Sequence, residues 1–456
     1  MNLEEYKSKL DALLNANRNS EVRGALMMLN VVDIAEYLET LENDKMLKVF
    51  RILPKDVSVD VFSYMDDDQR ANLLSSIGDA EAGALVSEMF VDDAVDFLEE
   101  LPATLVKRVL ANVSEEQRKT INRFLSYPDN SAGSIMTIEY CEFHEGITAQ
   151  EAMRELKRTG VDKETIYTLY VLDAQRTLVG TVPLRRLLLA DDDAPIESLM
   201  NTNFICVGTL DDQEVVAETV RKYDLMSVPV VDKEGRLVGI VTVDDIMDVL
   251  QDEATEDIEK MNALLPSEDE YMKTGVVTLA KNRLPWLLFM MISGIFTGLI
   301  IEFFEGSLAN METKVAGIGI ALTACIPMLM GTGGNCGSQS STLVIRGLAV
   351  GEIQPIDAAR VLWKESRVAM VVSVVLALVN FCIQCFVFSR PLLVALAVSI
   401  AMIGTVILSK CIGCTLPLLA KKLKLDPALM AAPLITTIVD ACSLLILFLC
   451  ASAFFL

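Results

Sequence analysis

The chain has 456 residues, which is too many for one ordinary domain, and its 63 Asp and Glu residues outnumber 39 Lys and Arg residues to give a formal net charge of −24. Nucleic-acid binding requires basic patches, so we expect no nucleic-acid partner. A single histidine makes a zinc site improbable. Most of the ten cysteines fall in apolar runs after residue 320, so we expect buried thiols rather than a disulfide framework.

The first part of the chain, residues 1–127, is polar overall and consists of short amphipathic segments. Apolar residues recur three or four apart in each segment, and Pro54 and Pro102 mark two of the breaks between them. Such a pattern predicts a small helical domain in which helix pairs stack like a solenoid. The N-terminus has no basic flank followed by an apolar stretch, so we expect this part to stay in the cytosol.

An internal duplication follows in residues 128–250. The segment L-Y-V-L-D at 169–173 returns as V-P-V-V-D at 228–232, and the turn and strand that follow it return as well. Each copy, about 128–195 and 196–250, is therefore predicted to fold as strand, helix, strand, turn, strand and helix. The pair resembles tandem CBS domains. Thr242 and Asp245 match the Thr-x-x-Asp by which some such pairs hold the ribose of an adenine nucleotide, although they could equally cap the next helix.

The stretch after this duplication is strongly acidic. Helical spacing places Asp245, Asp248 and Asp252 on one helix face, and further acidic residues lie just beyond. An acidic connecting helix is expected at residues 251–280. Carboxylates on one helix face repel each other unless cations bridge them. The stretch is therefore either a sensor of divalent cations or a well-solvated acidic helix.

Residues 281–456 form a predicted membrane domain. Its long runs with at most one charge predict five transmembrane helices: 284–301, 315–345, 368–389, 391–409 and 427–456. The expected fold class is thus a multidomain membrane protein with a helical solenoid-like N-domain, a tandem α/β CBS pair and a five-helix α transmembrane domain.

Charges between these runs predict the orientation. Most basic residues lie before the first run, between the second and third, and between the fourth and fifth, where Lys410 and Lys421 are assigned to a loop. The positive-inside rule then places the N-terminus in the cytosol and the C-terminus outside, and we expect a multi-pass protein of the bacterial inner membrane.

Two features inside the membrane domain indicate transport. Residues 327–342 are rich in Gly, Ser and Thr, and polar residues at membrane depth require neighbouring helices or a water-filled cavity. Asp440 lies near the middle of the last run, where a lone carboxylate is by default a functional-site hypothesis. Its alternatives are a protonated acid or a pair with another helix. Small residues including Ala432 and Thr436 would leave room for a hydrated ion such as Mg²⁺, which keeps most of its waters.

No Lys or His is predicted inside a span, and Asp440 is the one intramembrane carboxylate. A serine mechanism would lack its base and an aspartyl mechanism would lack its second carboxylate. We therefore expect no enzyme.

The glycine-rich motif P-M-L-M-G-T-G-G-N-C-G-S-Q-S-S-T at 327–342, together with the segment from Asp426-Pro427 to Asp440, is similar to the signature of the MgtE family of magnesium channels and transporters. The order of domains is similar too. The resemblance implies a homodimer, surrounded by membrane lipid, with one pore at the subunit interface. It assigns Asp440 to selection of hydrated Mg²⁺, and Ala432 and Thr436 to the pore lining. Asn335, Ser338 and Gln339 are expected to shape the pore wall.

The resemblance also implies that internal Mg²⁺ closes the pore by bridging acidic residues of the cytosolic domains. The matching positions are Asp92, Asp96, Asp212, Glu214, Asp224, Asp245, Asp248, Glu253, Glu256 and Asp257. We therefore expect a Mg²⁺-selective, Mg²⁺-gated channel for magnesium uptake, with ATP as a possible ligand of the CBS pair. The alternative is a secondary transporter of Mg²⁺ or Co²⁺ coupled to Na⁺ or H⁺.

Overall fold

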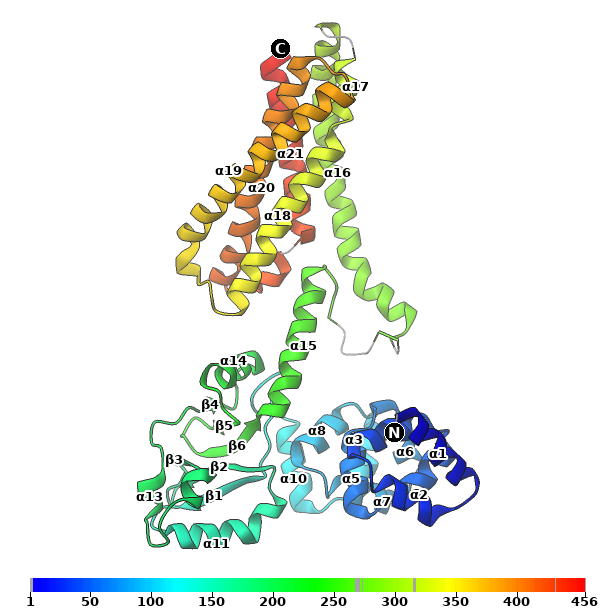
Figure 1. The fold of residues 1–456 in the computed structure, drawn as a ribbon, viewed down its shortest axis with the longest axis vertical. Helices are drawn as coiled ribbons and strands as arrows, with labels where there is room; N and C mark the ends of the chain where they lie inside the picture. The colour runs from blue at the N-terminus through cyan, green and yellow to red at the C-terminus, as the bar shows by residue number, and fades with distance from the viewer. Residues whose placement is uncertain (1–2, 267–270, 273, 315–316, 431, 456) are drawn as a thin grey trace. The chain divides into compact units, whose positions relative to one another are not determined.

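The computed structural model describes residues 3–266, 271–272, 274–314, 317–430 and 432–455, and the chain divides into two compact units, Met1–Gln251 and Asp252–Leu456. Figure 1 shows their elements. We describe each unit separately.

The first unit begins with short helices, as the amphipathic pattern predicts. Side chains at helix starts satisfy free backbone N–H groups: Asn30 accepts from Val32 at the start of α3, and Ser114 accepts from Gln117 at the start of α10. Phe62 and Phe97 meet edge to face in the core, with ring centroids 5.0 Å apart. The helices are α1 (Leu3–Asn15), α2 (Asn19–Leu26), α3 (Val31–Glu39), α4 (Asn43–Phe50), α5 (Lys55–Ser63), α6 (Asp67–Ser76), α7 (Asp79–Val86), α8 (Val91–Glu99), α9 (Ala103–Leu110) and α10 (Glu115–Phe124).

Two similar three-stranded sheets complete the first unit and confirm the predicted CBS pair. The order is β1–β2–β3 in one sheet and β4–β5–β6 in the other, each with one parallel and one antiparallel pairing. The elements are β1 (Tyr140–His144), α11 (Ala149–Thr159), β2 (Thr165–Leu172), β3 (Leu178–Pro183), α12 (Leu184–Leu188), α13 (Ile196–Leu199), β4 (Val207–Gly208), α14 (Gln213–Tyr223), β5 (Ser227–Val231), β6 (Leu237–Thr242) and α15 (Val243–Met261).

The two sheets are joined at equivalent positions, which explains why the repeat keeps its glycines. Thr137 bridges to Ile240 beside Gly239, and Asn201 bridges to Thr181 beside Gly180. A Cβ on Gly239 would lie 2.7 Å from the Thr137 carbonyl oxygen, so only glycine fits there.

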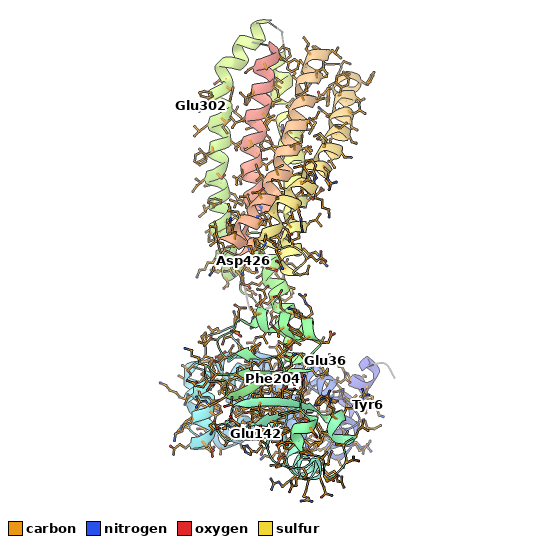
Figure 2. All side chains as sticks on the ribbon, turned by 90° about the vertical axis from the view of Figure 1, so that its left-hand side faces the viewer. Tyr6, Glu36, Glu142, Phe204, Glu302 and Asp426 are labelled. Carbon is orange, nitrogen blue, oxygen red and sulfur yellow. The ribbon has the colours of Figure 1, made fainter. Side chains whose placement is uncertain are left out.

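Among its described residues, the second unit contains five helical stretches that are long and apolar enough to cross a membrane, as predicted. Its helices are α16 (Val276–Lys314), α17 (Ile318–Thr323), α18 (Ile326–Ala349), α19 (Ala358–Cys382), α20 (Leu392–Lys422) and α21 (Ala432–Phe455). Glu302 on α16 and Asp426, just before α21, lie toward opposite ends of this bundle (Figure 2).

The long second span breaks between α17 and α18, before Pro327, rather than at its glycines. Pro327 fits the first turn of α18 because its missing N–H would have no helical partner there. The glycines are instead helical and permit close packing: a Cβ on Gly413 of α20 would lie 2.3 Å from the carbonyl oxygen of Gly337.

One part of the charge assignment was wrong. Lys410 does not lie in a loop but within α20, where it is 5% exposed. The fourth apolar run of the sequence ends just before this charge, but the helix continues to Lys422. It can do so because Glu365 neutralises the Lys410 ammonium group inside the bundle.

Candidate ion path and acidic sites

Asp440 lies on α21 and is half-buried in the single chain. Among the described residues, none donates a hydrogen bond to its carboxylate or lies within ion-pair distance of it. The hydroxyls of Thr436 and Thr437 both bond to the Pro433 carbonyl oxygen, at 2.9 and 3.0 Å. The Asp440 carboxylate therefore keeps its binding capacity for a ligand. The side chain of Ala432 lies outside the described residues, so its predicted place in the pore lining stays a prediction.

The glycine-rich helix α18 packs directly against α21 at the level of Asp440. A Cβ on Gly333 would lie 2.8 Å from Val439 and 3.0 Å from the Ser443 hydroxyl, and one on Gly334 would lie 3.0 Å from Thr436. Glycine thus lets the two backbones approach at van der Waals distance. On the other side of α18, Asn335 and Gln339 are exposed in the single chain, and Ser338 is half-buried. The structure therefore brings the polar helix beside the acidic one and leaves a polar face open.

Helices α18, α19 and α20 share a charged cluster that the sequence did not predict. Lys410 Nζ donates to Ser340 Oγ at 3.1 Å, Ser340 Oγ donates to Glu365 Oε2 at 2.7 Å, and the Lys410–Glu365 ion pair measures 3.6 Å. The statements that no Lys lies inside a span and that Asp440 is the one intramembrane carboxylate were therefore wrong, because the candidate spans include Lys410 and Glu365. Lys410 still does not provide the base of a serine mechanism, because it is paired with Glu365 and the Ser340 hydroxyl donates its hydrogen bond to Glu365 rather than to Lys410.

Carboxylates of α8 form a repulsive group in the first unit with carboxylates from the first turn of α15 and from the segment before β2. Asp92 is 9% exposed, and its Oδ1 has no hydrogen-bond partner among the described residues. Burial and the negative charge of Asp245 raise the pKa of Asp92 well above its ordinary value. Burial and the charges of Asp245 and Asp244 raise the pKa of Glu164 to about 7. Sequence reasoning missed Glu164 because it lies outside every acidic run.

Two predicted sensing residues, Asp96 and Asp245, lie beside this group. The surrounding protein and the charges of Glu99 and Asp93 raise the pKa of Asp96 to about 7, although its side chain reaches solvent, which screens part of the repulsion. Burial raises the pKa of Asp245 to about 6 against the opposing hydrogen bond from Thr242. Asp92 and Asp96, the predicted pair on α8, therefore both lie close to Asp245, a carboxylate from a distant part of the chain.

Two of the predicted sensing residues, Asp212 and Asp224, flank α14 and have local structural roles. Asp212 caps α14 by accepting from the Glu214 N–H, and Asp224 ends the helix in the left-handed conformation with φ 50°. Glu214 and Asp248 are exposed, Asp248 on α15. The charges that add to burial in raising the pKa of Asp92 come instead from Asp245, Asp93 and Glu164.

The remaining predicted sensing residues lie at the end of α15, near the beginning of the last span. The predicted bounds of the connecting helix, 251–280, were wrong, because α15 begins at Val243 and ends at Met261, where the chain turns at Ala263 in the left-handed conformation with φ 56°. Lys260 donates to Glu256 at 2.7 Å and to Asp426 at 2.8 Å. Burial and the charge of Asp426 raise the pKa of Asp257, and Glu253 lies half-buried one turn before it. The sequence predicted the acidic residues of this site but not Asp426 as the group they face. Within the described residues, no three His, Cys, Asp or Glu side chains are arranged to hold a metal ion.

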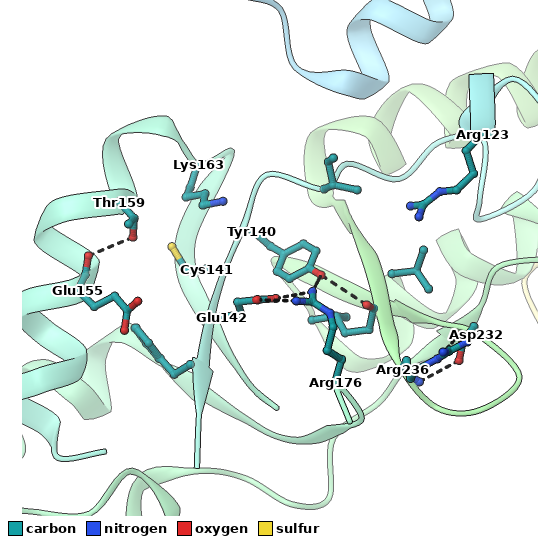
Figure 3. A pocket seen from close by; sticks show the side chains of 14 residues that line it. Arg123, Tyr140, Cys141, Glu142, Glu155, Thr159, Lys163, Arg176, Asp232 and Arg236 are labelled. Carbon is teal, nitrogen blue, oxygen red and sulfur yellow. Dashed lines mark hydrogen bonds and ion pairs between the residues drawn. The ribbon is translucent and has the colours of Figure 1, made fainter. Parts of the chain in front are cut away.

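The predicted nucleotide residues are bonded to each other. Thr242 Oγ1 donates to Asp245 Oδ2 at 2.6 Å, and the Thr242 N–H approaches the same oxygen at 3.4 Å, as in a helix cap. A cavity of about 680 Å³ lies elsewhere in the CBS pair, lined by both sheets (Figure 3). Arg176 in that cavity is paired with Glu142 at 2.8 Å and Arg236 with Asp232 at 2.6 Å. Neither residue of the Thr-x-x-Asp motif lines it.

Three family models match parts of this chain. The MgtE model, described as a divalent cation transporter, matches residues 326–450, the MgtE intracellular N domain matches 29–130, and the CBS domain matches 196–252. The magnesium transporter MgtE of Thermus thermophilus is 34% identical over 449 residues, which is 97% of each chain.

Two solved structures are similar to the first part of the chain. A crystal structure of the soluble part of a magnesium transporter is 34% identical, with a TM-score of 0.53, and covers 56% of this chain and 100% of its own. A crystal structure of the cytosolic domain of the Mg²⁺ channel MgtE in complex with ATP is 33% identical, with a TM-score of 0.51, and covers 53% and 99%.

Proposed function

The chain belongs to the MgtE family of divalent cation transporters, and from this premise we propose that it is a Mg²⁺-selective channel for magnesium uptake that internal Mg²⁺ closes. The membership confirms the predicted family and the prediction of transport rather than catalysis. It also agrees with the five helices that are long enough to cross a membrane.

The observation that carries the proposal is Asp440, an unpaired carboxylate on a membrane helix that packs against a glycine-rich polar helix. An isolated carboxylate at membrane depth is expensive unless an ion or water solvates it. Mg²⁺ is bound in proteins through one or two carboxylates while keeping several waters. Asp440 therefore suits selection of the hydrated ion, with Thr436 near it on the same helix.

A homodimer in the bacterial inner membrane, surrounded by lipid, accommodates the open polar face of α18. Asn335 and Gln339 are exposed in the single chain, and lipid would leave their amide groups without hydrogen bonds. A second copy facing them would enclose a polar path and place two Asp440 carboxylates around it. The positive-inside rule places the N-terminus in the cytosol and the C-terminus outside.

Closure by Mg²⁺ follows from the repulsion in the cytosolic part. Burial and the negative charge of Asp245 raise the pKa values of Asp92 and Glu164, so without a cation the proximity of these carboxylates is unfavourable. Mg²⁺ that binds only the compact arrangement would shift the population towards it. The sensing residues at the end of α15, Glu253, Glu256 and Asp257, would act in the same way beside Asp426.

The residues of this chain support ATP binding at one of the two CBS copies. A relative's cytosolic domain was crystallised with ATP, but here the first CBS copy has Pro183 and Arg186 in place of Thr-x-x-Asp. The second copy keeps Thr242 and Asp245, and ATP binding there would require Asp245 to exchange its bond with Thr242 for one with the ribose.

Patch-clamp recording of the purified protein in a bilayer tests the proposal. We expect single-channel steps carried by Mg²⁺ that disappear when Mg²⁺ is raised on the cytosolic side. Flux without unitary steps, and dependent on a Na⁺ or H⁺ gradient, would favour the alternative of a coupled transporter. ATP varied separately at fixed Mg²⁺ shows whether the nucleotide changes closure.

A further inference from the structure

The buried cluster of Lys410, Glu365 and Ser340 has no part in the proposed ion path, yet it joins three membrane helices. Lys410 on α20 is 5% exposed, Ser340 on α18 is fully buried, and the Glu365 side chain on α19 is 14% exposed. Each member bonds to the other two, with distances of 2.7, 3.1 and 3.6 Å. The ammonium group therefore has both its counterion and its hydrogen-bond acceptor inside the bundle.

Burying such a pair is a poor way to gain stability. Removing two charges from water costs about as much as their attraction returns, and apolar side chains of similar volume often serve as well. The helices also pack closely without it, through Gly337 against Gly413 and through Val344 and Leu348 in a separate apolar cluster. A role in orientation explains the cluster better, because polar groups in a nonpolar interior can pair in one arrangement only.

The helix whose orientation this cluster would fix is α18. Ser340 lies on the face that carries Gly333 and Gly337, and the helical period of about 3.6 residues places Asn335 and Gln339 on the other side. Turning α18 by one residue, about 100°, would bring Gln339 towards Glu365 and move Asn335 away from its exposed position. The bonds of Ser340 to Lys410 and Glu365 oppose this rotation.

We infer that Lys410, through Ser340 and Glu365, is a positioning residue that fixes the rotation of α18 and thereby the cation selectivity of the path beside Asp440. This rests on the proposed function, because it assumes that α18 and α21 line the path. Lys410 itself does not touch the ion. Its substitution changes the geometry of the wall and leaves the Asp440 carboxylate in place.

The test uses the full-length protein in liposomes, with Mg²⁺ and Ca²⁺ influx measured separately and thermal unfolding followed in detergent. Lys410→Met leaves Glu365 buried without its counterion, whereas K410M/E365Q leaves no charge unpaired. Ser340→Ala removes the bridge and keeps the ion pair. Lys421→Met, an exposed lysine near the end of the same helix, is the matched control.

We expect K410M to change the Mg²⁺-to-Ca²⁺ influx ratio about tenfold and S340A to change this ratio less. K410M/E365Q should restore most of the wild-type ratio. K421M should match the wild type. If K410M keeps the wild-type ratio in protein that remains folded, or only lowers the unfolding temperature, the cluster is structural and the inference is wrong. A double variant as altered as K410M would show that Glu365 is not the partner through which Lys410 acts. A wild-type protein that passes no Mg²⁺ would overturn the proposed function first.

Discussion

The two units of this chain treat buried charge in opposite ways. In the first unit, Asp92 and Glu164 lie close to Asp245, whose negative charge adds to burial in raising their pKa values. In the second unit, Lys410 pairs with Glu365, and Lys260 pairs with Asp426. Asp440 is the exception, since no described residue pairs with it. Paired charges have a structural role, whereas an unpaired carboxylate lacks a neutralising charge, which a cation can supply.

Asp440→Asn gives the sharpest test of this contrast and the largest expected effect. The amide keeps the size of the side chain but removes the charge that would attract Mg²⁺, so we expect loss of Mg²⁺ influx into liposomes and of growth rescue in a strain that lacks magnesium uptake. Asp357→Asn, a half-buried carboxylate paired with Arg360, is the control. Influx at the wild-type rate in D440N would remove Asp440 from the ion path.

Neutralising carboxylates in the first unit should act on closure rather than on conduction. In D92N/D245N the repulsion that Mg²⁺ relieves is gone, and so are its ligands. We expect the channel to need about tenfold more cytosolic Mg²⁺ to close, with unchanged single-channel current. E115Q serves as the control because Glu115 is an exposed carboxylate paired with Lys119 and is not one of the predicted sensing residues. A double variant that closes at the wild-type Mg²⁺ concentration would contradict the sensor.

The carboxylates around Asp92 also predict that the stability of the folded first unit depends on pH. The folded pKa values of Asp245 and Glu164, about 6 and about 7, exceed their ordinary values of 3.8 and 4.5. The protonated groups therefore favour the folded arrangement, and this stabilisation is lost as pH rises through 6 and 7. In Mg²⁺-free buffer, hydrogen exchange of α8, corrected for its intrinsic pH dependence, should be slower at pH 5.5 than at pH 8. Saturating Mg²⁺ should remove most of the difference. Equal protection at both pH values without Mg²⁺ would show that these carboxylates do not repel.

The smallest effect is expected at Lys260. Its hydrogen bonds to Asp426 and Glu256 outweigh the effect of burial and raise its pKa, so it supplies one fixed positive charge where a cation would otherwise sit. Because partly exposed ion pairs contribute little, Lys260→Met should change the Mg²⁺ concentration for half-closure by less than about fivefold. Lys222→Met on α14 is the control. Both variants are measured by patch clamp, and a larger shift would mean that Lys260 itself, and not only the carboxylates around it, takes part in closure.

Much of the fold could be predicted from local patterns in the sequence. The helical front part, the duplicated strand–helix units and five apolar stretches depend on periodicities that neighbouring residues carry, and the structure contains all of them. Asp440 was found because an isolated charge in a long apolar run is visible in one dimension. The glycine-rich motif indicated close helix contacts for the same reason.

Tertiary structure decided which charges have partners. Lys410 was placed in a loop because a charge interrupts an apolar run, and only the approach of α18 and α19 provides the hydroxyl and carboxylate that let it stay inside. Glu164 joined the α8 carboxylates although no pattern in its own segment marks it. Hydropathy and helical period are properties of neighbours along the chain, whereas the free energy of a buried charge depends on groups that only folding brings within a few ångströms.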